Sequence, residues 1–427
     1  MKFLVPALII RLVGFLIPAA IAYSAEIPWK PNVSADTSEW NQRSAIKWMA
    51  TCGSPKEDWI NRIIELSDGS ILAAGFIDRD DNAKAPDWSA ISLKFTTDGK
   101  IADSRAFGGS GIDAIWAVHE LADHSIVLGG FSNSESAGGL DGYLAIADPT
   151  GRIVTERRFG GQQYDRTTDV VATNDNSFVL IGETRSIGAG ERDVFLVKTD
   201  REGKEVWRKA FGGPQTDRGL AGVETKDGSV VVIGGAAGND DKGEGLVLKI
   251  DRDGKQVWRA LIPGDKDVIP HGVSLLPDGR ILVIGYTNSW GATVNDYFVA
   301  TISLGGKVEK IQVLGGKDDD RAMTSFLAKD GNTWLIGYSK SFGTGKWDML
   351  IAQVGPDGTF APDVIVLGTP EDDNGTTISE AGNGDILVGA YTTAPSHGKE
   401  PPDLMVARLD RKQLQRTKDG LTIKTIQ

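Results

Sequence analysis

The chain has 427 residues, of which 40% are hydrophobic, 24% charged and 7% aromatic, with one cysteine and a formal net charge of −12. This composition is typical of a globular protein with a large core, and it excludes disordered, collagen-like and disulfide-stapled classes. The negative charge argues against nucleic acid and anionic lipid as partners.

Residues 1–22 have the pattern of a secretory signal peptide. Lys2 is followed by an apolar stretch and by the small-residue site Ala20-Ile21-Ala22, after which we expect cleavage. A membrane anchor is the alternative, but Arg11 and Pro18 interrupt the segment, and no other stretch is long enough to span a bilayer. We therefore expect a periplasmic or extracellular protein without a membrane span.

A repeat of about 52 residues organises the rest of the chain. Each unit starts with a pair of small residues and continues with four short apolar runs bounded by turns, a pattern typical of buried strands. Seven such units predict an all-β fold, a seven-bladed β-propeller of four-stranded antiparallel blades, over residues 46–415. The small pairs are Gly53-Ser54, Gly108-Gly109, Gly160-Gly161, Gly212-Gly213, Pro263-Gly264, Gly315-Gly316 and Gly368-Thr369.

The two ends of the propeller predict how the ring closes. Residues 46–52, IKWMATC, resemble a fourth strand without its first three, whereas the seventh unit has only three clear strands. Pairing them completes blade seven and removes two exposed sheet edges. A competing fourth strand is LTIKTIQ at 421–427, so residues 416–427 are a C-terminal tail or an extra strand, and residues 23–45 a loop-rich arm.

The unit SFVLIGETRSIGAGERDVFLVKTDREGKEVW, from Ser177 to Trp207, resembles the bacterial exported β-propeller repeat proteins. Their units carry a Gly-Gly pair, an Asp, an Asp-Gly turn and a D-x-(F/Y)-(L/V)-x-K-x-D strand. The resemblance implies a propeller and export, but no single activity, because that group is functionally mixed. The segments from Gly203 to Trp207 and from Gly254 to Trp258 are distantly similar to quinoprotein repeats, and two copies in seven units make a quinoprotein the least favoured enzyme.

The order of strands predicts two different faces of the ring. Tight turns lie on one face, and the longer connections, of 9 to 12 residues between second and third strands, lie on the other, where function is expected. Two sets of aspartates repeat on this long-loop face in six of the seven units. We expect them to accept backbone N–H groups that order each loop. The first set is Asp58, Asp113, Asp165, Asp217, Asp320 and Asp373, and the second is Asp87, Asp141, Asp193, Asp296, Asp348 and Asp403.

A binding site is expected where the units differ. Three arginines follow the first aspartate at the mouth of the central channel, where they either grip an anionic ligand or pair with aspartates. Aromatic residues recur after the second strand, where they either stack on a sugar, anchor a protein or pack between blades. The predicted ligand-binding residues are Arg166, Arg218, His271, Tyr286, Trp290, Arg321, Tyr338 and Trp347.

Metal and cofactor motifs are weak. The chain has four histidines, and no two share one blade's loops at a ligand-like spacing, so we predict no metal site and no cofactor. Calcium is the one ion that we retain, because Asp78, Asp80 and Asn82 have the spacing of a calcium loop, although Ala83 and Ser89 break that motif.

These patterns favour an exported binding or scaffold module, a monomer that recognises a protein or a carbohydrate through its long-loop face. The alternative is a propeller enzyme, a lyase or hydrolase, with its site at the channel mouth. His271 would then be its general base.

Overall fold

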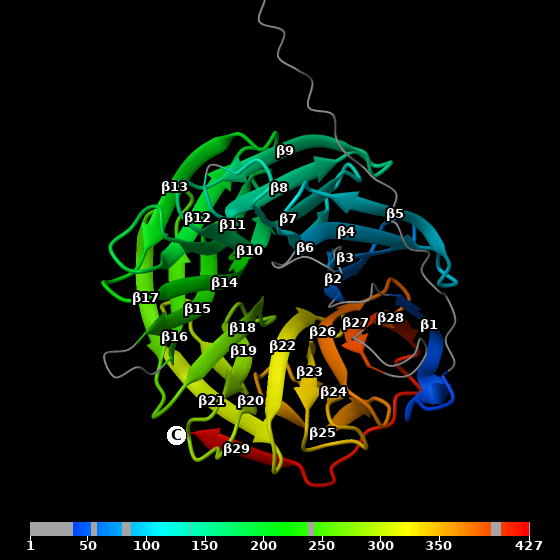
Figure 1. The fold of residues 1–427 in the computed structure, drawn as a ribbon. Helices are drawn as coiled ribbons and strands as arrows, with labels where there is room; N and C mark the ends of the chain where they lie inside the picture. The colour runs from blue at the N-terminus through cyan, green and yellow to red at the C-terminus, as the bar shows by residue number, and fades with distance from the viewer. Residues whose placement is uncertain are drawn as a thin grey trace, which may run out of the picture.

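The computed structural model describes residues 37–52, 58–78, 87–136, 138–237, 243–393 and 403–426. Its strands form seven antiparallel sheets arranged as blades around a central axis (Figure 1). In each of the first six blades the chain runs outward from the axis through four consecutive strands. The predicted seven-bladed β-propeller is thereby confirmed.

The first two strands of every blade supply its axial half. The innermost strands are β2 (Asp58–Glu65), β6 (Asp113–Glu120), β10 (Asp165–Ala172), β14 (Asp217–Glu224), β18 (Val268–Leu275), β22 (Asp320–Leu327) and β26 (Asp373–Glu380). The second strands are β3 (Ile71–Asp78), β7 (Ile126–Ser132), β11 (Phe178–Thr184), β15 (Val230–Ala237), β19 (Ile281–Thr287), β23 (Thr333–Ser339) and β27 (Ile386–Thr392).

The outer strands complete the sheets. The third strands are β4 (Trp88–Phe95), β8 (Asp141–Ala147), β12 (Asp193–Thr199), β16 (Gly243–Ile250), β20 (Asp296–Ile302), β24 (Asp348–Val354) and β28 (Asp403–Leu409). The fourth strands of blades one to six are β5 (Ile101–Phe107), β9 (Ile153–Phe159), β13 (Glu205–Phe211), β17 (Gln256–Ile262), β21 (Val308–Gly315) and β25 (Phe360–Leu367).

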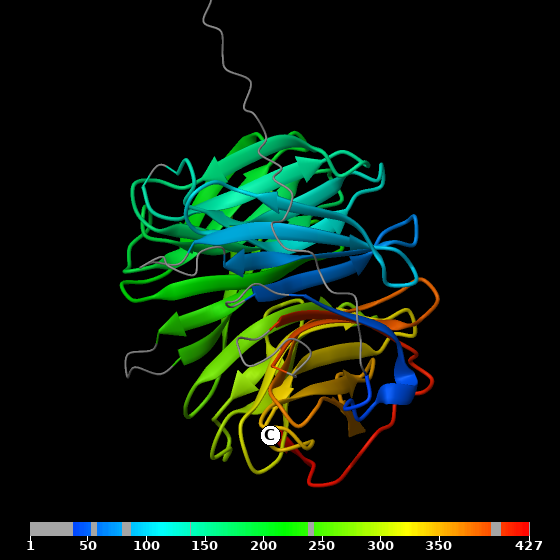
Figure 2. The same ribbon diagram turned by 45° about the vertical axis from the view of Figure 1, so that its right-hand side comes forward.

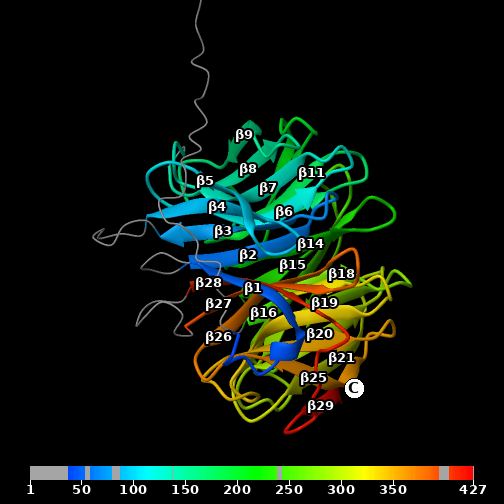
Figure 3. The same cartoon turned by 90° about the vertical axis from the view of Figure 1, so that its right-hand side faces the viewer.

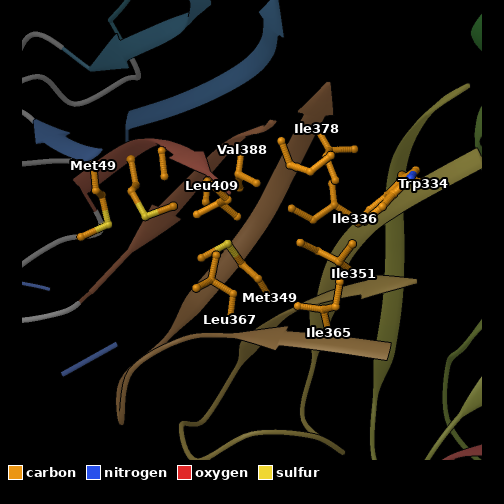
Figure 4. Packing of buried hydrophobic residues seen from close by; sticks show 14 of the residues in the cluster. Met49, Trp334, Ile336, Met349, Ile351, Ile365, Leu367, Ile378, Val388 and Leu409 are labelled. Atoms are coloured by element: carbon orange, nitrogen blue, oxygen red, sulfur yellow. The ribbon is translucent and has the colours of Figure 1, made fainter. Parts of the chain in front are cut away.

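The N-terminal strand β1 (Ile46–Cys52) closes the ring as the fourth strand of blade seven. It pairs antiparallel with β28, with Thr51 opposite Met405 (Figure 3). Met49 packs in the core shared with blade six, in the same cluster as Leu409 (Figure 4), and Cys52 packs in the core shared with blade one. Because β1 buries both of its faces between neighbouring blades, closure joins the two ends of the propeller through hydrophobic burial as well as strand pairing.

A tryptophan of the closing strand also ties blade seven to blade one. The indole of Trp48 packs on Gly99, whose φ of 85° and missing side chain leave room for the ring. Its N–H donates to the Thr97 carbonyl oxygen at 3.0 Å. Trp207 and Trp258, from the two quinoprotein-like segments, dock in the same way on the turn of the next blade. These tryptophans are therefore contacts between blades.

The competing C-terminal strand does not close the ring. The strand β29 (Thr422–Ile426) pairs with β21 at the outer edge of blade five and makes that blade five-stranded (Figures 1 and 2). It covers an edge that would otherwise be exposed. The C-terminal segment is therefore an extra strand of blade five.

The other described residues are turns and short connections. The 3-10 helix η1 (Arg43–Ala45) precedes β1, and Trp40 before it is buried in the core between blades six and seven. In the ranges given above, no helix is long and apolar enough to cross a membrane. The predicted signal peptide lies outside the described residues.

A bulge repeats in all seven innermost strands. After the third residue of each strand, one residue has no partner in the neighbouring strand and the register shifts. A bulge redirects side chains close to a functional surface. The bulged residues are Asn61, Trp116, Thr168, Leu220, His271, Met323 and Thr376.

Candidate functional site

The first set of repeated aspartates orders the connections between blades. In five blades a buried carboxylate accepts the backbone N–H of the residue four positions earlier, at 2.7 to 3.0 Å. The predicted structural role of these aspartates is confirmed there. The pairs are Gly109 and Asp113, Gly161 and Asp165, Gly213 and Asp217, Gly316 and Asp320, and Thr369 and Asp373.

The second set of aspartates orders the long loops and brings like charges together. Asp193 accepts the N–H groups of Ala189 and Gly190, within its own loop. Burial, and then the charge of the neighbouring Asp320 of the next blade, raise the pKa of Asp296 to about 7. At this place carboxylates of adjacent blades therefore lie near one another, and Asp296 and Asp320 favour protonation.

One residue beyond the first aspartate, the residue type differs from blade to blade. At this level a residue of the innermost strand is paired across the sheet with a residue of the second strand, and we call these the axial pairs. Three have an arginine in the innermost strand and five have an aromatic residue in the second. In blade order they are Trp59 and Phe76, Ala114 and Phe131, Arg166 and Glu183, Arg218 and Gly235, Ile269 and Tyr286, Arg321 and Tyr338, and Asn374 and Tyr391.

The axial aromatics of blades one and two belong to the core. Phe76 is 4% exposed and Phe131 is 3% exposed, within one buried cluster. Phe76 stacks on Trp88 at 4.3 Å between ring centroids, and Trp59 lies 4.7 Å from the ring of Tyr391 in blade seven. In this part of the ring the packing interpretation of the repeated aromatic position is correct.

In blades five and six the aromatics are half-buried and surround a cation. The guanidinium of Arg321 lies 5.5 Å from the centroid of the Tyr286 ring and 5.9 Å from that of Trp347. Trp347 meets Tyr338 edge to face at 5.0 Å, and Lys340 lies 4.3 Å above the Trp347 ring. Tyr286, Arg321, Tyr338 and Trp347 form a group that we call the aromatic patch.

Asp319 fixes the cation of this patch. Its carboxylate accepts two hydrogen bonds from Arg321, at 2.9 and 2.7 Å, and a third from Asn295 at 3.1 Å. This bidentate pairing raises the pKa of Arg321 above its usual range and lowers the number of orientations that the guanidinium can adopt. The aspartate pairing considered for the arginines therefore occurs at Arg321.

His271 is the bulged residue of blade five and lies beside the aromatic patch. Its ring stacks on Tyr286 with centroids 5.2 Å apart. Burial, and then the charge of Arg321, lower the pKa of His271 to about 4, so the imidazole is neutral at neutral pH. Among the described residues no carboxylate is paired with it, which leaves a weakly basic acceptor rather than a histidine activated by an acid.

Arg166 and Arg218 belong to a second group, on blades three and four. Both pair with Glu183, which is only 1% exposed: Arg166 Nε lies 2.8 Å from Oε1 and Arg218 Nε lies 3.3 Å from Oε2. Arg192, just before β12, donates a hydrogen bond to Oε2 at 3.0 Å. We call Glu183 and these three arginines the arginine cluster.

Of this cluster, only Arg166 and Arg218 were predicted from the sequence. Arg166 and Arg218 were selected because they follow repeated aspartates, but their partner is Glu183 of the second strand and not an aspartate. The available signal was that Glu183 occupies a position that is aromatic in five of the seven blades. The signal for Arg192 was its position directly before the repeated Asp193, where Trp347 precedes Asp348 in blade six.

Trp290 lies away from both groups. Its ring meets Phe298 edge to face at 6.0 Å and packs on the core of blade five, and its backbone N–H donates to Asp265 at 2.7 Å. Of the eight predicted ligand-binding residues, the structure thus brings together His271, Tyr286, Arg321, Tyr338 and Trp347, places Arg166 and Arg218 in the arginine cluster, and leaves Trp290 apart.

Two open cavities lie farther out, at equivalent places in blades three and four. One, of about 350 Å³, is lined by Asp165 and Arg208 among others, and one of about 410 Å³ by Asp217 and Arg259. Both are built from the repeated Gly-Gly pair and the first aspartate. We attribute them to the repeat, because their polar lining is already used to order the blade connections.

Metal sites find little support in the part of the chain that the structure describes. There, no group of three or more His, Cys, Asp or Glu side chains is positioned to hold a metal ion. The calcium-like spacing that begins at Asp78 continues into residues 79–86, which lie outside the described ranges.

Comparisons with known proteins find similar folds but no relatives in sequence. No family model and no curated protein matches the chain. Among solved structures, a protein of unknown function from Dyadobacter fermentans is 14% identical with a TM-score of 0.49, and covers 84% of this chain and 96% of its own. A protein of unknown function from Bacteroides caccae is 13% identical with a TM-score of 0.41, and covers 70% and 98%.

A third similar structure is the α-L-arabinofuranosidase Arb93A from Fusarium graminearum, solved with an iminosugar inhibitor. It is 12% identical with a TM-score of 0.48, and covers 84% of this chain and 96% of its own. Likeness at this level carries no argument about function.

Proposed function

We propose that this protein is an exported binding module that recognises a glycan, or alternatively a protein, through its long-loop face. Export is supported by the signal-like pattern of residues 1–22 and by the resemblance to exported bacterial propeller repeats. Binding is supported by the aromatic patch, a region of the long-loop face where the repeat gives way to half-buried aromatics around a fixed cation.

The geometry of the patch suits a sugar. Aromatic faces stack on the apolar faces of sugar rings, and a neighbouring guanidinium donates hydrogen bonds to hydroxyl oxygens. Asp319 and the surrounding rings already hold Arg321 in place, so little side-chain entropy remains to be lost on binding. This preorganisation is the observation that carries the proposal.

The test uses the difference between the two loop tryptophans. We expect native mass spectrometry of the protein from its own host to show a ligand of a few hundred daltons (~10² Da) that is lost on denaturation. Trp347→Ala should weaken binding of that ligand by at least about tenfold, because it removes the aromatic ring that lies against both Arg321 and Lys340.

Trp290→Ala is the matched control, since Trp290 packs on Phe298 rather than in the patch. Binding that is unchanged in Trp347→Ala and lost in Trp290→Ala would contradict the proposal.

An enzyme is the second candidate, and His271 is the observation that favours it. A neutral imidazole beside the Arg321 cation could accept a proton while the guanidinium stabilises a developing anion, as a lyase or hydrolase requires. Its low pKa makes it a weak base, so we rank this candidate second. Loss of turnover in His271→Ala, with retained ligand binding, would favour the enzyme over the binding module.

A further inference from the structure

We infer that the arginine cluster on blades three and four is an anion site, and that it binds the carboxylate of an acidic, uronic-acid-containing oligosaccharide. The inference rests on the proposed function, because it adds a charged subsite to the glycan-binding face. It starts from an excess of positive charge around Glu183, which is larger than compensation of that one carboxylate requires.

The cluster holds three guanidinium groups against one carboxylate. Glu183 is 1% exposed, so a single well-placed arginine would suffice to compensate its charge. Instead Arg166, Arg192 and Arg218 lie within 2.8 to 3.3 Å of its oxygens, which leaves two positive charges in excess. Like charges held this close repel one another, and a second anion would relieve that repulsion.

The donors for a second anion are present. Among the described residues, only the contact of Arg192 with Glu183 has the geometry of a hydrogen bond. Arg166 and Arg218 approach the same carboxylate through Nε as ion pairs, and their side chains are 25% and 47% exposed. Each guanidinium therefore has N–H groups to offer, and a planar fork of donors matches a carboxylate.

The ring of Tyr164 lies beside the cluster. Burial raises the pKa of Tyr164, and the charges of Arg166, Glu183, Arg192 and Arg218 all act on its hydroxyl. The guanidinium of Arg192 lies 5.2 Å from the centre of its ring, which helps to fix both side chains. Tyr164 thus packs against a guanidinium of the cluster and helps to hold it in place.

The place of the cluster in the ring favours an acidic glycan over an acidic peptide. Its two axial arginines lie on blades three and four, and the aromatic patch follows on blades five and six, at the same level of the strands. Cations and half-buried aromatic rings thus succeed one another over four neighbouring blades. A sugar chain with a carboxylate on one of its rings needs both kinds of contact, whereas an acidic peptide needs only the cations.

The experiment measures binding of tri-galacturonate and of its neutral methyl ester by titration calorimetry at about 50 mM salt. We expect the wild-type protein to bind the acid at least about tenfold more tightly than the ester. Arg218→Ala and Arg166→Ala should bring that ratio close to one while ester binding is retained. Lys307→Ala, which removes an exposed charge in the turn between β20 and β21, is the matched control and should preserve the ratio.

Several results would overturn the inference. Equal binding of acid and ester by the wild type, an unchanged ratio in both arginine variants, or no binding of either sugar would each do so. Tighter binding of hexaglutamate than of tri-galacturonate would assign the cluster to an acidic peptide instead. Ester binding that is lost in Trp347→Ala, together with an acid-to-ester ratio of one, would leave the proposed function standing and remove only the anion site.

Discussion

The two faces of the ring use aspartate in opposite ways. On the tight-turn face, a hydrogen bond from the Ser70 hydroxyl, assisted by Lys94, lowers the pKa of Asp68 to about 2. On the long-loop face, burial raises the pKa of Asp373 to about 6, although hydroxyl and amide donors oppose the shift. Asp68 is thus a solvated carboxylate that stabilises a turn in its ionised form, whereas Asp373 is a buried carboxylate that resists ionisation.

This difference shows what the long-loop face tolerates. Asp296, Asp320 and Asp373 have raised pKa values, so their ionisation lowers the stability of the folded state at neutral pH. Glu183 differs from them, because three arginines pair with it. Side-chain arrangements that lower the stability of the folded state are typical of functional surfaces. The same comparison yields three predictions, from the largest effect to the smallest.

The largest effect is expected from Glu183→Ala. Removing a buried carboxylate would leave three guanidinium groups without their anion, so we expect the free energy of unfolding to fall by about 3 to 5 kcal/mol, measured by urea denaturation. Glu183→Gln keeps the shape and should cost less. A change in Glu183→Ala below about 1 kcal/mol would show that the cluster does not depend on this charge.

A smaller effect should separate the two faces directly. Asp373 accepts hydrogen bonds from the Thr369 amide, the Thr369 hydroxyl and the Thr392 hydroxyl, at 2.5 to 2.7 Å. Asp373→Ala should lower the free energy of unfolding by about 2 to 3 kcal/mol, because buried donors lose their acceptor.

Asp148 is the control on the tight-turn face, where Asp148→Ala leaves donors that water can satisfy. Equal effects of Asp373→Ala and Asp148→Ala on the free energy of unfolding would remove the distinction between the faces.

The smallest effect is a dependence of stability on pH. A carboxylate whose pKa is raised by folding stabilises the folded state below its unfolded pKa, and that stabilisation is lost as pH rises through the folded pKa. With Asp296 at about 7 and Asp320 at about 6, the free energy of unfolding should fall between about pH 4 and pH 7. The lowered pKa of Asp68 acts the other way, and its stabilisation is lost only as pH falls from about 4 toward 2.

Asp296→Asn tests this assignment. The amide imitates the protonated carboxyl, so the slope of stability between about pH 4 and pH 7 should become shallower, as followed by thermal unfolding at each pH. Asp148→Asn on the opposite face should leave that slope unchanged, since folding lowers the pKa of Asp148 to about 2. A profile that is the same in wild type and Asp296→Asn would contradict the role of burial at Asp296.

Much of the architecture could be predicted because the repeat is redundant. Seven copies of the same turn and strand signals average out local ambiguity, so blade number, strand order and the N-terminal closure were all inferred correctly. The partner of β29 could not be inferred, because five residues carry too little pattern to choose between two free sheet edges.

The candidate site was predicted only where the repeat supplied a reference. Arg166, Arg218 and Arg321 stood out because they follow a repeated aspartate, and Tyr286 and Tyr338 because they share one position. Arg192 was missed because its partner Glu183 lies across a loop on the neighbouring strand. Asp319 was missed although its partner Arg321 is only two residues away. Trp290 was selected for a surface role, yet it packs on the blade-five core, since a half-buried ring and an exposed one look alike in a single sequence.

By itself the sequence determined the blades, because the period of its turns and apolar runs specifies local hydrogen bonding and burial in every unit. Only the tertiary structure decided which charges meet. Whether Arg218 pairs with an aspartate of its own strand or with Glu183 of the preceding blade depends on how two sheets pack around the axis. Salt-bridge partners are set by distances of a few ångströms between neighbouring blades, and no periodicity within one blade records them.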